Sequence, residues 1–227
     1  MTVAAVIVPH DAQEALADGA GRVAARRIVD AAWAGGAMPI VVVVDDPDGR
    51  VAVVVEGSPA VLVDPAGGAA EVAAHGWRPG AEVAAYRSGA AAAVASVSET
   101  SALLLWPGRM TWVDPETVTS LIEAHGRRPG DIVRPERAGQ VGWPVLVPVA
   151  RVAEVFDQGR GDVEALIASA SDVISLELGD PGTILGRETG LDALPDYAGP
   201  PEPVGGPPPE WGAAAAEVQD QDQESPV

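Results

Sequence analysis

Residues 103–118, LLLWPGRMTWVDPETV, join a buried strand to a helix and decide the class of the fold. Three leucines and a tryptophan are typical of a strand inside a sheet. Asp114 followed by Pro115 predicts a helix start, because aspartate caps a helix N-terminus and proline fits its first turn. Arg109 lies between the two elements, at the carboxyl end of the strand, where open α/β sheets bind their ligands.

Strand and helix signals alternate on both sides of this stretch. Short runs rich in valine predict strands, and alanine-rich runs with helical spacing predict helices. The alternation favours a three-layer α/β/α sandwich with a Rossmann-like, mostly parallel sheet. The predicted strands are 3–9, 38–46, 51–57, 60–65, 102–106, two within 131–149, and 173–179; the predicted helices are 20–37, 84–99, 114–127, 150–158 and 162–171.

The composition changes from about Tyr197 onward. Residues 197–227 hold seven of the 21 prolines and six acidic residues but no basic one. Such a segment cannot bury a core, so we expect an α/β domain over 1–196 and a disordered, Pro-rich acidic tail over 197–227. The tail is either a solvated appendage or an interaction module, in which Trp211 and the alanines after it fold against a partner groove.

Charge and composition exclude several classes of function. The formal net charge of −19 argues against a nucleic-acid partner, which a basic patch would have to meet. Cysteine is absent, which excludes disulfides, thiolate catalysis and zinc–cysteine sites. Lysine is also absent, so any bound phosphate or carboxylate must be met by arginine or by backbone N–H groups.

Neither a membrane segment nor a targeting peptide is indicated by the sequence. No stretch approaches the roughly 20 apolar residues that a spanning helix needs. The start, MTVAAVIVPHD, lacks the basic region and the small-residue cleavage site of a signal peptide. We therefore expect a cytoplasmic protein with no membrane partner.

Five segments, in order along the chain, resemble the molybdenum cofactor nucleotidyltransferases, the MobA-like NTP transferase family. The most specific is DIVRPERAGQVGWPVLVPV (131–149), which is similar to the family's IVRPVYEGRRGHPVLF and keeps two prolines, two glycines and Arg134. The other four segments are 21–43, 84–95, 112–125 and 176–197. The resemblance implies the fold of the nucleotide-diphospho-sugar transferases.

The family's reaction joins CTP or GTP to the terminal phosphate of molybdopterin and releases pyrophosphate. The resemblance therefore implies three elements: a Gly-rich loop with basic residues for the triphosphate, acids that bind Mg²⁺, and a pocket for the acceptor phosphate.

The first two of these elements are replaced in this sequence. Where the family has LAAGxSxRxGxxK, this chain has VPHDAQEALADGAG, with Asp11, Glu14 and Asp18 in place of basic residues. Arg109 aligns with one metal-binding aspartate of the family and Gly186 with the other. An arginine has no lone pair to give to Mg²⁺. These five residues mark a degenerate site, and we expect no catalysis, no catalytic residue and no bound metal or cofactor.

The acceptor side of the family's site is better kept. Ser88 lies in one matching segment, and five residues of another are candidates to meet an anionic small molecule, with Trp143 stacking on it; these five are Arg134, Arg137, Gly139, Gly142 and Trp143. The alternative for the two glycines is an ordinary turn between strands. Asp180 matches a turn position of the family, which favours a structural role.

Three functions stay open on this evidence. The first is a non-catalytic binding or scaffolding subunit, acting with a protein partner or as a homo-oligomer and placed in molybdenum cofactor metabolism. The second is an active nucleotidyltransferase that uses Mg²⁺ with CTP or GTP and takes its metal ligands from Asp45, Asp46 and Asp48, although DDPDG is also typical of a solvated turn. The third is an interaction module acting through the acidic tail. The first predicts an ion pair from Arg109 to an acid of the 11–18 loop, closing the old pocket.

Overall fold

A computed structural model describes residues 2–65, 80–157 and 162–199 of the chain. Its centre is one mixed sheet with the strand order β3-β2-β1-β4-β7-β5, in which β6 and β8 both pair with β5. Only β7 and the short β6 run against the other strands. The strands are β1 (Thr2–Val8), β2 (Ile40–Val43), β3 (Ala60–Val63), β4 (Thr100–Pro107), β5 (Ile132–Arg137), β6 (Gln140–Val141), β7 (Val145–Pro148) and β8 (Val173–Glu177).

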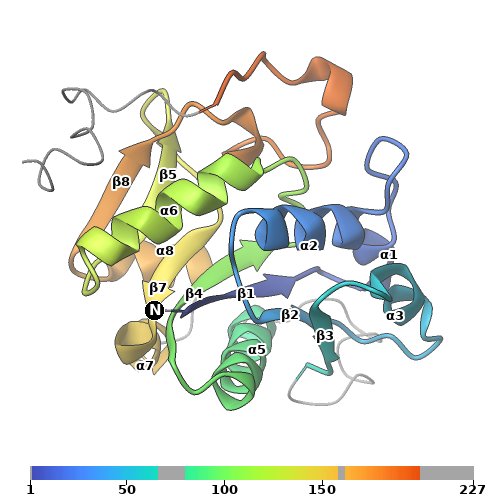
Figure 1. Ribbon diagram of the computed structural model, residues 1–227, viewed down its shortest axis with the longest axis horizontal. Coiled ribbons are helices and arrows are strands. Elements are labelled where there is room, and N and C mark those ends of the chain that lie inside the picture. The colour runs from blue at the N-terminus through green and yellow to red at the C-terminus, as the bar shows by residue number, and fades with distance from the viewer. Residues whose placement is uncertain (1, 66–79, 158–161, 200–227) are drawn as a thin grey trace, which may run out of the picture.

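Helices cover both faces of the sheet, which confirms the predicted three-layer α/β/α class (Figure 1). α2 and α6 lie together on one face, and α5, α7 and α8 lie on the other. The α-helices are α1 (Ala12–Ala15), α2 (Ala24–Ala34), α3 (Arg50–Val55), α5 (Ala81–Ser96), α6 (Pro115–Arg127), α7 (Val152–Asp157) and α8 (Val163–Ser169). Short 3₁₀ turns follow at Val149–Arg151, Pro181–Thr183 and Leu191–Ala193.

Two glycines allow the layers to approach closely. A Cβ added at Gly89 of α5 would lie 2.3 Å from Cγ1 of Val6, so the helix can rest directly on β1. A Cβ at Gly35, where α2 ends, would lie 2.4 Å from Cβ of Val118 on α6. The strands between these helices are buried on both faces, as their valine-rich sequences predict.

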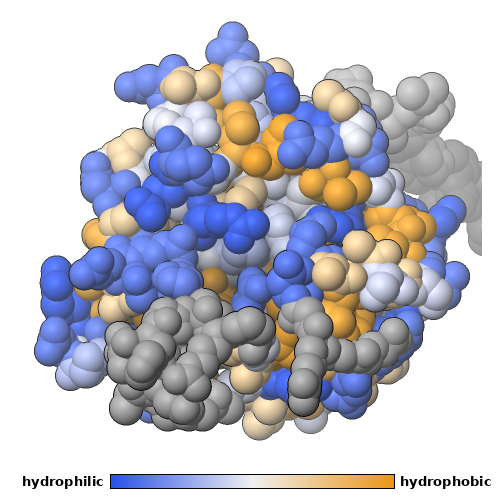
Figure 2. Space-filling model, turned by 180° about the vertical axis from the view of Figure 1, so that it is seen from behind, coloured by the Kyte–Doolittle hydropathy of each residue, from blue (hydrophilic) through white to orange (hydrophobic). Residues whose placement is uncertain are grey.

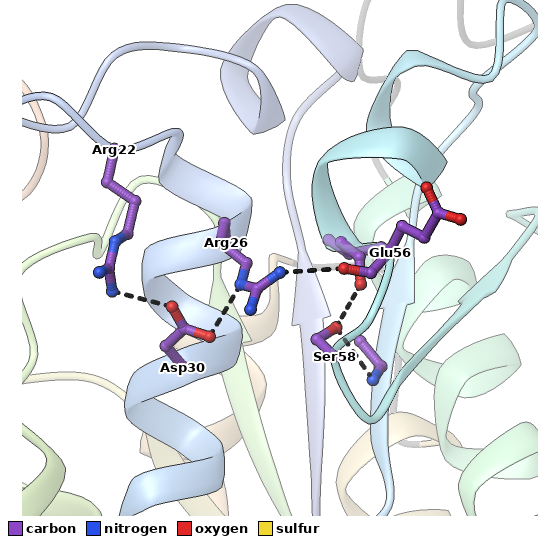
Figure 3. Close-up of polar contacts among 7 residues, drawn as sticks. Arg22, Arg26, Asp30, Glu56 and Ser58 are labelled. Carbon is purple, nitrogen blue, oxygen red and sulfur yellow. Dashed lines mark hydrogen bonds and ion pairs between the residues drawn. The ribbon is translucent and has the colours of Figure 1, made fainter.

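Polar contacts fix α2 to the loop between α3 and β3 (Figure 3). Arg26 donates from Nε to Asp30 at 2.9 Å and from an Nη to the carbonyl of Glu56 at 3.1 Å. Arg22, in the loop before α2, pairs with the same Asp30 at 2.8 Å, so one carboxylate binds two arginines. The ion pairs are partly exposed, and their main effect is to orient the helix.

The strand predicted over 51–57 is wrong, because these residues form helix α3. Val51 and Val55 are both buried, and their spacing of four residues places them on one face of a helix. The Asp46 carboxylate accepts the Ala52 N–H at 2.9 Å and stabilises the helix start. Local capping and burial of one face therefore outweigh the strand preference of a valine run.

The other predicted elements agree with the structure apart from their ends. Asp114 caps α6 by accepting the Glu116 N–H at 2.8 Å, and Pro115 occupies the first turn as predicted. The two strands predicted within 131–149 are β5 and β7, with β6 between them. Ala138 and Gly139 form the tight turn from β5 to β6, with φ of 52° and 80°.

Seen from behind the view of Figure 1, the surface is mainly hydrophilic, with separate apolar areas among the hydrophilic residues (Figure 2). Within the described ranges, no helix is long and apolar enough to cross a membrane. The tail predicted from Tyr197 onward falls mostly outside the described residues, which end at Gly199.

Candidate functional site

The candidate site lies where the central strands β1 and β4 reach their carboxyl ends. The loop after β1, the loop after β4 and the segment 180–190 meet there. The Gly108 N–H donates to the Val8 carbonyl at 2.9 Å, which joins the first two. The Arg187 N–H donates to the Arg109 carbonyl at 2.8 Å, which joins the third.

Arg109 and Gly186 are neighbours in space, although 77 residues separate them in the sequence. A Cβ added at Gly186 would lie 2.9 Å from the Arg109 carbonyl oxygen. The two positions at which the resemblance places metal-binding acids therefore adjoin each other, and neither carries a carboxylate.

Glu188 brings a carboxylate to this place from two residues further on. Its Oε2 lies 2.6 Å from the position of a Gly186 Cβ, and its Oε1 accepts the Gly186 N–H at 3.1 Å. An acid therefore stands close to where an aspartate at 186 would project. A 3₁₀ turn at Leu191–Ala193 follows Glu188.

The acids of the loop after β1 stabilise the loop itself. Asp11 caps α1 by accepting the Glu14 N–H at 2.7 Å, and Glu14 accepts the His10 N–H. Asp18 accepts the Gly21 N–H at 3.0 Å. A triphosphate needs backbone N–H groups and basic side chains as donors. This loop offers carboxylates instead, which are acceptors and carry negative charge.

The predicted ion pair between Arg109 and this loop is wrong. The Arg109 side chain is exposed and, in the described part of the chain, forms no ion pair with Asp11, Glu14 or Asp18. Its positive charge favours a lower pKa for the Glu82 carboxyl and the Tyr86 hydroxyl, one turn apart on α5, although burial raises both. Each loop acid is already held by a backbone N–H of its own turn, so the loop is ordered without Arg109.

Glu82 and Tyr86 of α5 carry polar groups that are partly or fully buried. Tyr86 is fully buried with its ring stacked on Phe156 at 6.4 Å between centroids, and its hydroxyl has no hydrogen-bond partner in the described part of the protein. Burial raises the pKa of the Tyr86 hydroxyl well above its usual value, and the Glu82 charge adds to the rise. Burial also raises the pKa of the Glu82 carboxyl, against the opposing effects of the Val163 N–H and of Arg109.

A comparison with family models matches residues 11–174 to the MobA-like NTP transferase domain. The chain belongs to this family. The match runs from the start of α1 into β8, so β1 is the one strand that lies wholly before it. No curated protein matches the sequence.

Solved structures share the MobA-like fold at low sequence identity. A nucleotidyl transferase from Methanothermobacter thermautotroptrophicus is 15% identical with a TM-score of 0.59, covering 78% of this chain and 87% of that one. Rv0371C from Mycobacterium tuberculosis, in complex with manganese, is 17% identical with a TM-score of 0.57, covering 78% and 88%. The 2-C-methyl-D-erythritol 4-phosphate cytidylyltransferase from Thermus thermophilus is 16% identical with a TM-score of 0.54, covering 82% and 92%. At these identities the likeness concerns the fold alone.

An arginine and a tryptophan hold the loops of the candidate site together on the side of α2. Arg27 lies over the Trp112 ring at 5.2 Å from its centroid and donates to the Gly19 carbonyl at 3.1 Å. Trp112 Nε1 donates to the carbonyls of Gly186 and Thr189 at 3.0 and 2.8 Å. Neither residue is predicted from the sequence as part of the site; the only local signal is a tryptophan with a polar tip in a loop.

On the acceptor side, the predicted ligand-binding residue Arg134 is engaged within the protein. Its side chain is 4% exposed and pairs with Glu164 of α8 at 2.7 Å. It also donates to the Gly142 carbonyl at 3.3 Å, and its guanidinium carbon lies 5.7 Å from the centroid of the buried Trp143 ring. These contacts tie α8 to β5, and among the described residues the Arg134 Nε–H is left without a partner.

The remaining acceptor-side candidates take part in local structure. The Gly142 N–H donates to the Pro135 carbonyl at 2.8 Å, and a Cβ at Gly142 would lie 2.4 Å from the Thr183 carbonyl oxygen. Gly139 occupies the turn described above. Arg137 donates to the Gly179 carbonyl at 3.0 Å, and Ser88 donates to the Asp64 carbonyl at 3.3 Å. The turn interpretation of the two glycines therefore accounts for their geometry.

The acidic DDPDG segment after β2 forms the solvated turn that was its alternative interpretation. The Gly49 N–H donates to the Asp46 carbonyl at 3.0 Å, while the Asp46 carboxylate caps α3. Among the residues that the structure describes, no three acidic or histidine side chains are placed to hold a metal ion together.

Asp180 has the structural role predicted for it. Its buried carboxylate accepts the Asp114 N–H at 2.9 Å, the Thr117 hydroxyl at 2.8 Å and the Gly182 N–H at 2.7 Å. Burial raises the pKa of the Asp180 carboxyl, and these donors oppose the rise. The contacts join the start of α6 to the segment that carries Gly186.

Proposed function

We propose that this chain is a catalytically degenerate member of the MobA-like family that acts as a binding or scaffolding subunit. The observation that carries the proposal is the adjacency of Arg109 and Gly186. The two positions at which the resemblance places metal-binding acids lie next to each other, and here they hold an arginine, which is a permanent cation, and a glycine. Membership of the family supports molybdenum cofactor metabolism as the setting of this role.

The residues at this place do not fit a Mg²⁺ ion held between two acids. Mg²⁺ requires oxygen ligands in a near-octahedral arrangement. Glu188 offers one carboxylate, and the side chain of its neighbour Arg109 offers only donors and a positive charge that repels the ion.

The loop after β1 supports the same proposal. A triphosphate at the carboxyl end of β1 would face Asp11, Glu14 and Asp18, with no lysine in the chain to offset them. Repulsion between these carboxylates and the phosphates disfavours binding of the triphosphate, most strongly where water is partly excluded.

Pyrophosphate release tests the proposal directly. We expect the full chain, given CTP or GTP with Mg²⁺ and molybdopterin as acceptor, to release no more pyrophosphate than a sample without protein. An active member of the family serves as the positive control. Release that rises with the concentration of this protein would contradict the proposal.

An active nucleotidyltransferase with an atypical acid is the second candidate, and the position of Glu188 favours it. In that case Glu188→Gln would abolish pyrophosphate release. Glu123→Gln is the matched control, because Glu123 is an exposed acid on α6 whose ion pair with Arg127 is long, at 3.9 Å.

A further inference from the structure

A buried histidine joins α6 to the sheet at the end of β4 opposite to the candidate site. His125 lies in the last turn of α6, and its side chain is 1% exposed. Its Nε2 lies 3.2 Å from the hydroxyl oxygen of Ser101, near the start of β4. The Ser101 hydroxyl in turn donates to the Thr2 carbonyl at 3.1 Å, at the start of β1. Two hydrogen bonds in series therefore connect the helix with the first residues of two central strands.

These two contacts assign the position of the proton on the imidazole. The Ser101 hydroxyl has one hydrogen, and the Thr2 carbonyl can only accept, so that hydrogen is donated to the carbonyl. The hydroxyl oxygen must then accept from the histidine, which places the ring hydrogen on Nε2. The other ring nitrogen, Nδ1, is a bare acceptor that is buried and has no partner among the described residues.

No acid is placed to compensate a positive charge on this ring, within the described ranges. Strands β1, β4 and β7 carry no titratable side chain. The other neighbours of α6 are β5 and α2, and burial alone lowers the pKa of His125, without a contribution from their charges or from those of α6. The charged side chains on these elements are Glu116, Glu123 and Arg127 of α6, Arg128 and Asp131 directly after it, Arg134, Glu136 and Arg137 of β5, and Arg26, Arg27 and Asp30 of α2.

We propose that His125 is an acid-sensitive lock, which in its neutral form holds the end of α6 to β1 and β4 and on protonation releases it. A protonated imidazole is a donor at both nitrogens. In the folded protein the new Nδ1–H would be buried without an acceptor, and the positive charge would be buried without an acid beside it. Water satisfies both in a chain whose α6 has left the strands, so protonation favours that state.

The other end of the same helix connects the lock to the candidate site. At the start of α6 the Asp114 N–H and the Thr117 hydroxyl donate to Asp180, which belongs to the segment that carries Gly186. Release of α6 therefore also frees that segment. The inference goes beyond the proposed function, because it holds whether or not the chain is catalytic.

The direction of the pH dependence follows from the two states of the ring. A histidine in an unfolded chain takes up its proton around pH 6.5, whereas burial moves the pKa of His125 in the folded protein below that value. The unfolded state therefore binds more protons than the folded state as the pH falls below about 6.5, and the folded state loses stability there.

Urea denaturation of the full chain and of His125→Gln, at about pH 7.5 and about pH 5.5, measures the lock. Glutamine can donate to the Ser101 hydroxyl through its amide but cannot be protonated. Between the two pH values we expect the folding equilibrium constant of the natural chain to fall about tenfold more than that of the variant, as the exclusion of one proton from the folded state implies. His10→Gln is the matched control, because it removes an exposed histidine, and it should follow the natural chain. An equal fall in the natural chain and in His125→Gln overturns the proposal.

NMR of the natural chain, labelled in its histidine nitrogens, is a second test that does not depend on how well the variant folds. The signals of His125 are assigned through the backbone, and the shifts of the two ring nitrogens distinguish both neutral tautomers from the charged ring. We expect the Nε2–H tautomer in the folded protein at both pH values. An Nδ1–H tautomer, or a charged ring in the folded protein at about pH 5.5, overturns the proposal.

Discussion

At position 109 the backbone and the side chain are in different environments. The Arg109 carbonyl accepts the Arg187 N–H and so fixes the segment that carries Gly186, while its side chain is exposed. Resemblance to the family is enough to identify positions 109 and 186 as a pair from the sequence alone. The parts played by Tyr86 and Glu188 could not be predicted, because they depend on packing between residues far apart in the sequence.

Both tyrosines of the chain should ionise late in the folded protein. Burial raises the pKa of Tyr197 to about 12 and that of Tyr86 well above its usual value. We predict that the native protein shows almost no phenolate absorbance at about pH 10, where tyrosines in an unfolded chain are half ionised. The folded state then binds more protons than the unfolded state, so the free energy of unfolding falls as the pH rises above about 10.

An ultraviolet titration of the native and the denatured protein measures this difference. Tyr86→Phe should leave only the signal of Tyr197, and Tyr197→Phe should remove the signal at a pH of about 12. A native protein in which either tyrosine titrates like the denatured sample would contradict the burial of that hydroxyl.

Among the elements, α6 and α3 show what the sequence can and cannot predict. The start of α6 can be predicted from the sequence because Asp114 and Pro115 act locally, within one turn. The helix α3 cannot be predicted from its valines, because residues 50–55 form a helix and not a strand through the burial of Val51 and Val55, where α3 packs against α1 and α2. Strand order and the reversal of β7 likewise depend on contacts that the sequence does not display.

The junction between α6 and the 180–190 segment depends on Asp180. We predict that Asp180→Ala lowers the free energy of unfolding by about 2–4 kcal/mol, since it leaves buried donors of Asp114, Thr117 and Gly182 unpaired. Chemical denaturation measures the loss. Asp192→Ala is the control, because Asp192 is exposed in a 3₁₀ turn and should change stability by less than about 0.5 kcal/mol.

At the scale of the whole molecule, the excess of acid is unevenly distributed. Residues 200–227 contain six acids and no base, so removing them changes the formal net charge from −19 to −13. The domain without them still has a strong negative field, which disfavours polyanionic partners. The negative charge of the loop after β1 is therefore shared by the protein as a whole.

Deletion of residues 200–227 tests the role of the tail. The family match ends at 174 and the residues that the structure describes already share one buried core, so we predict an unchanged melting temperature. Light scattering of both forms measures the oligomeric state. A change in that state, with the melting temperature preserved, would support the tail as an interaction module; a large fall in the melting temperature would contradict the domain boundary.

The close fit around Gly186 has a consequence for substitution at this position. A Cβ here would lie 2.9 Å from the Arg109 carbonyl oxygen and 2.6 Å from a Glu188 carboxylate oxygen. A change of this glycine to aspartate would therefore place a side chain in occupied space, and the Glu188 side chain and the loop of Arg109 would both have to move to admit it. A metal-binding acid cannot be introduced at position 186 by one substitution without rearranging its neighbours.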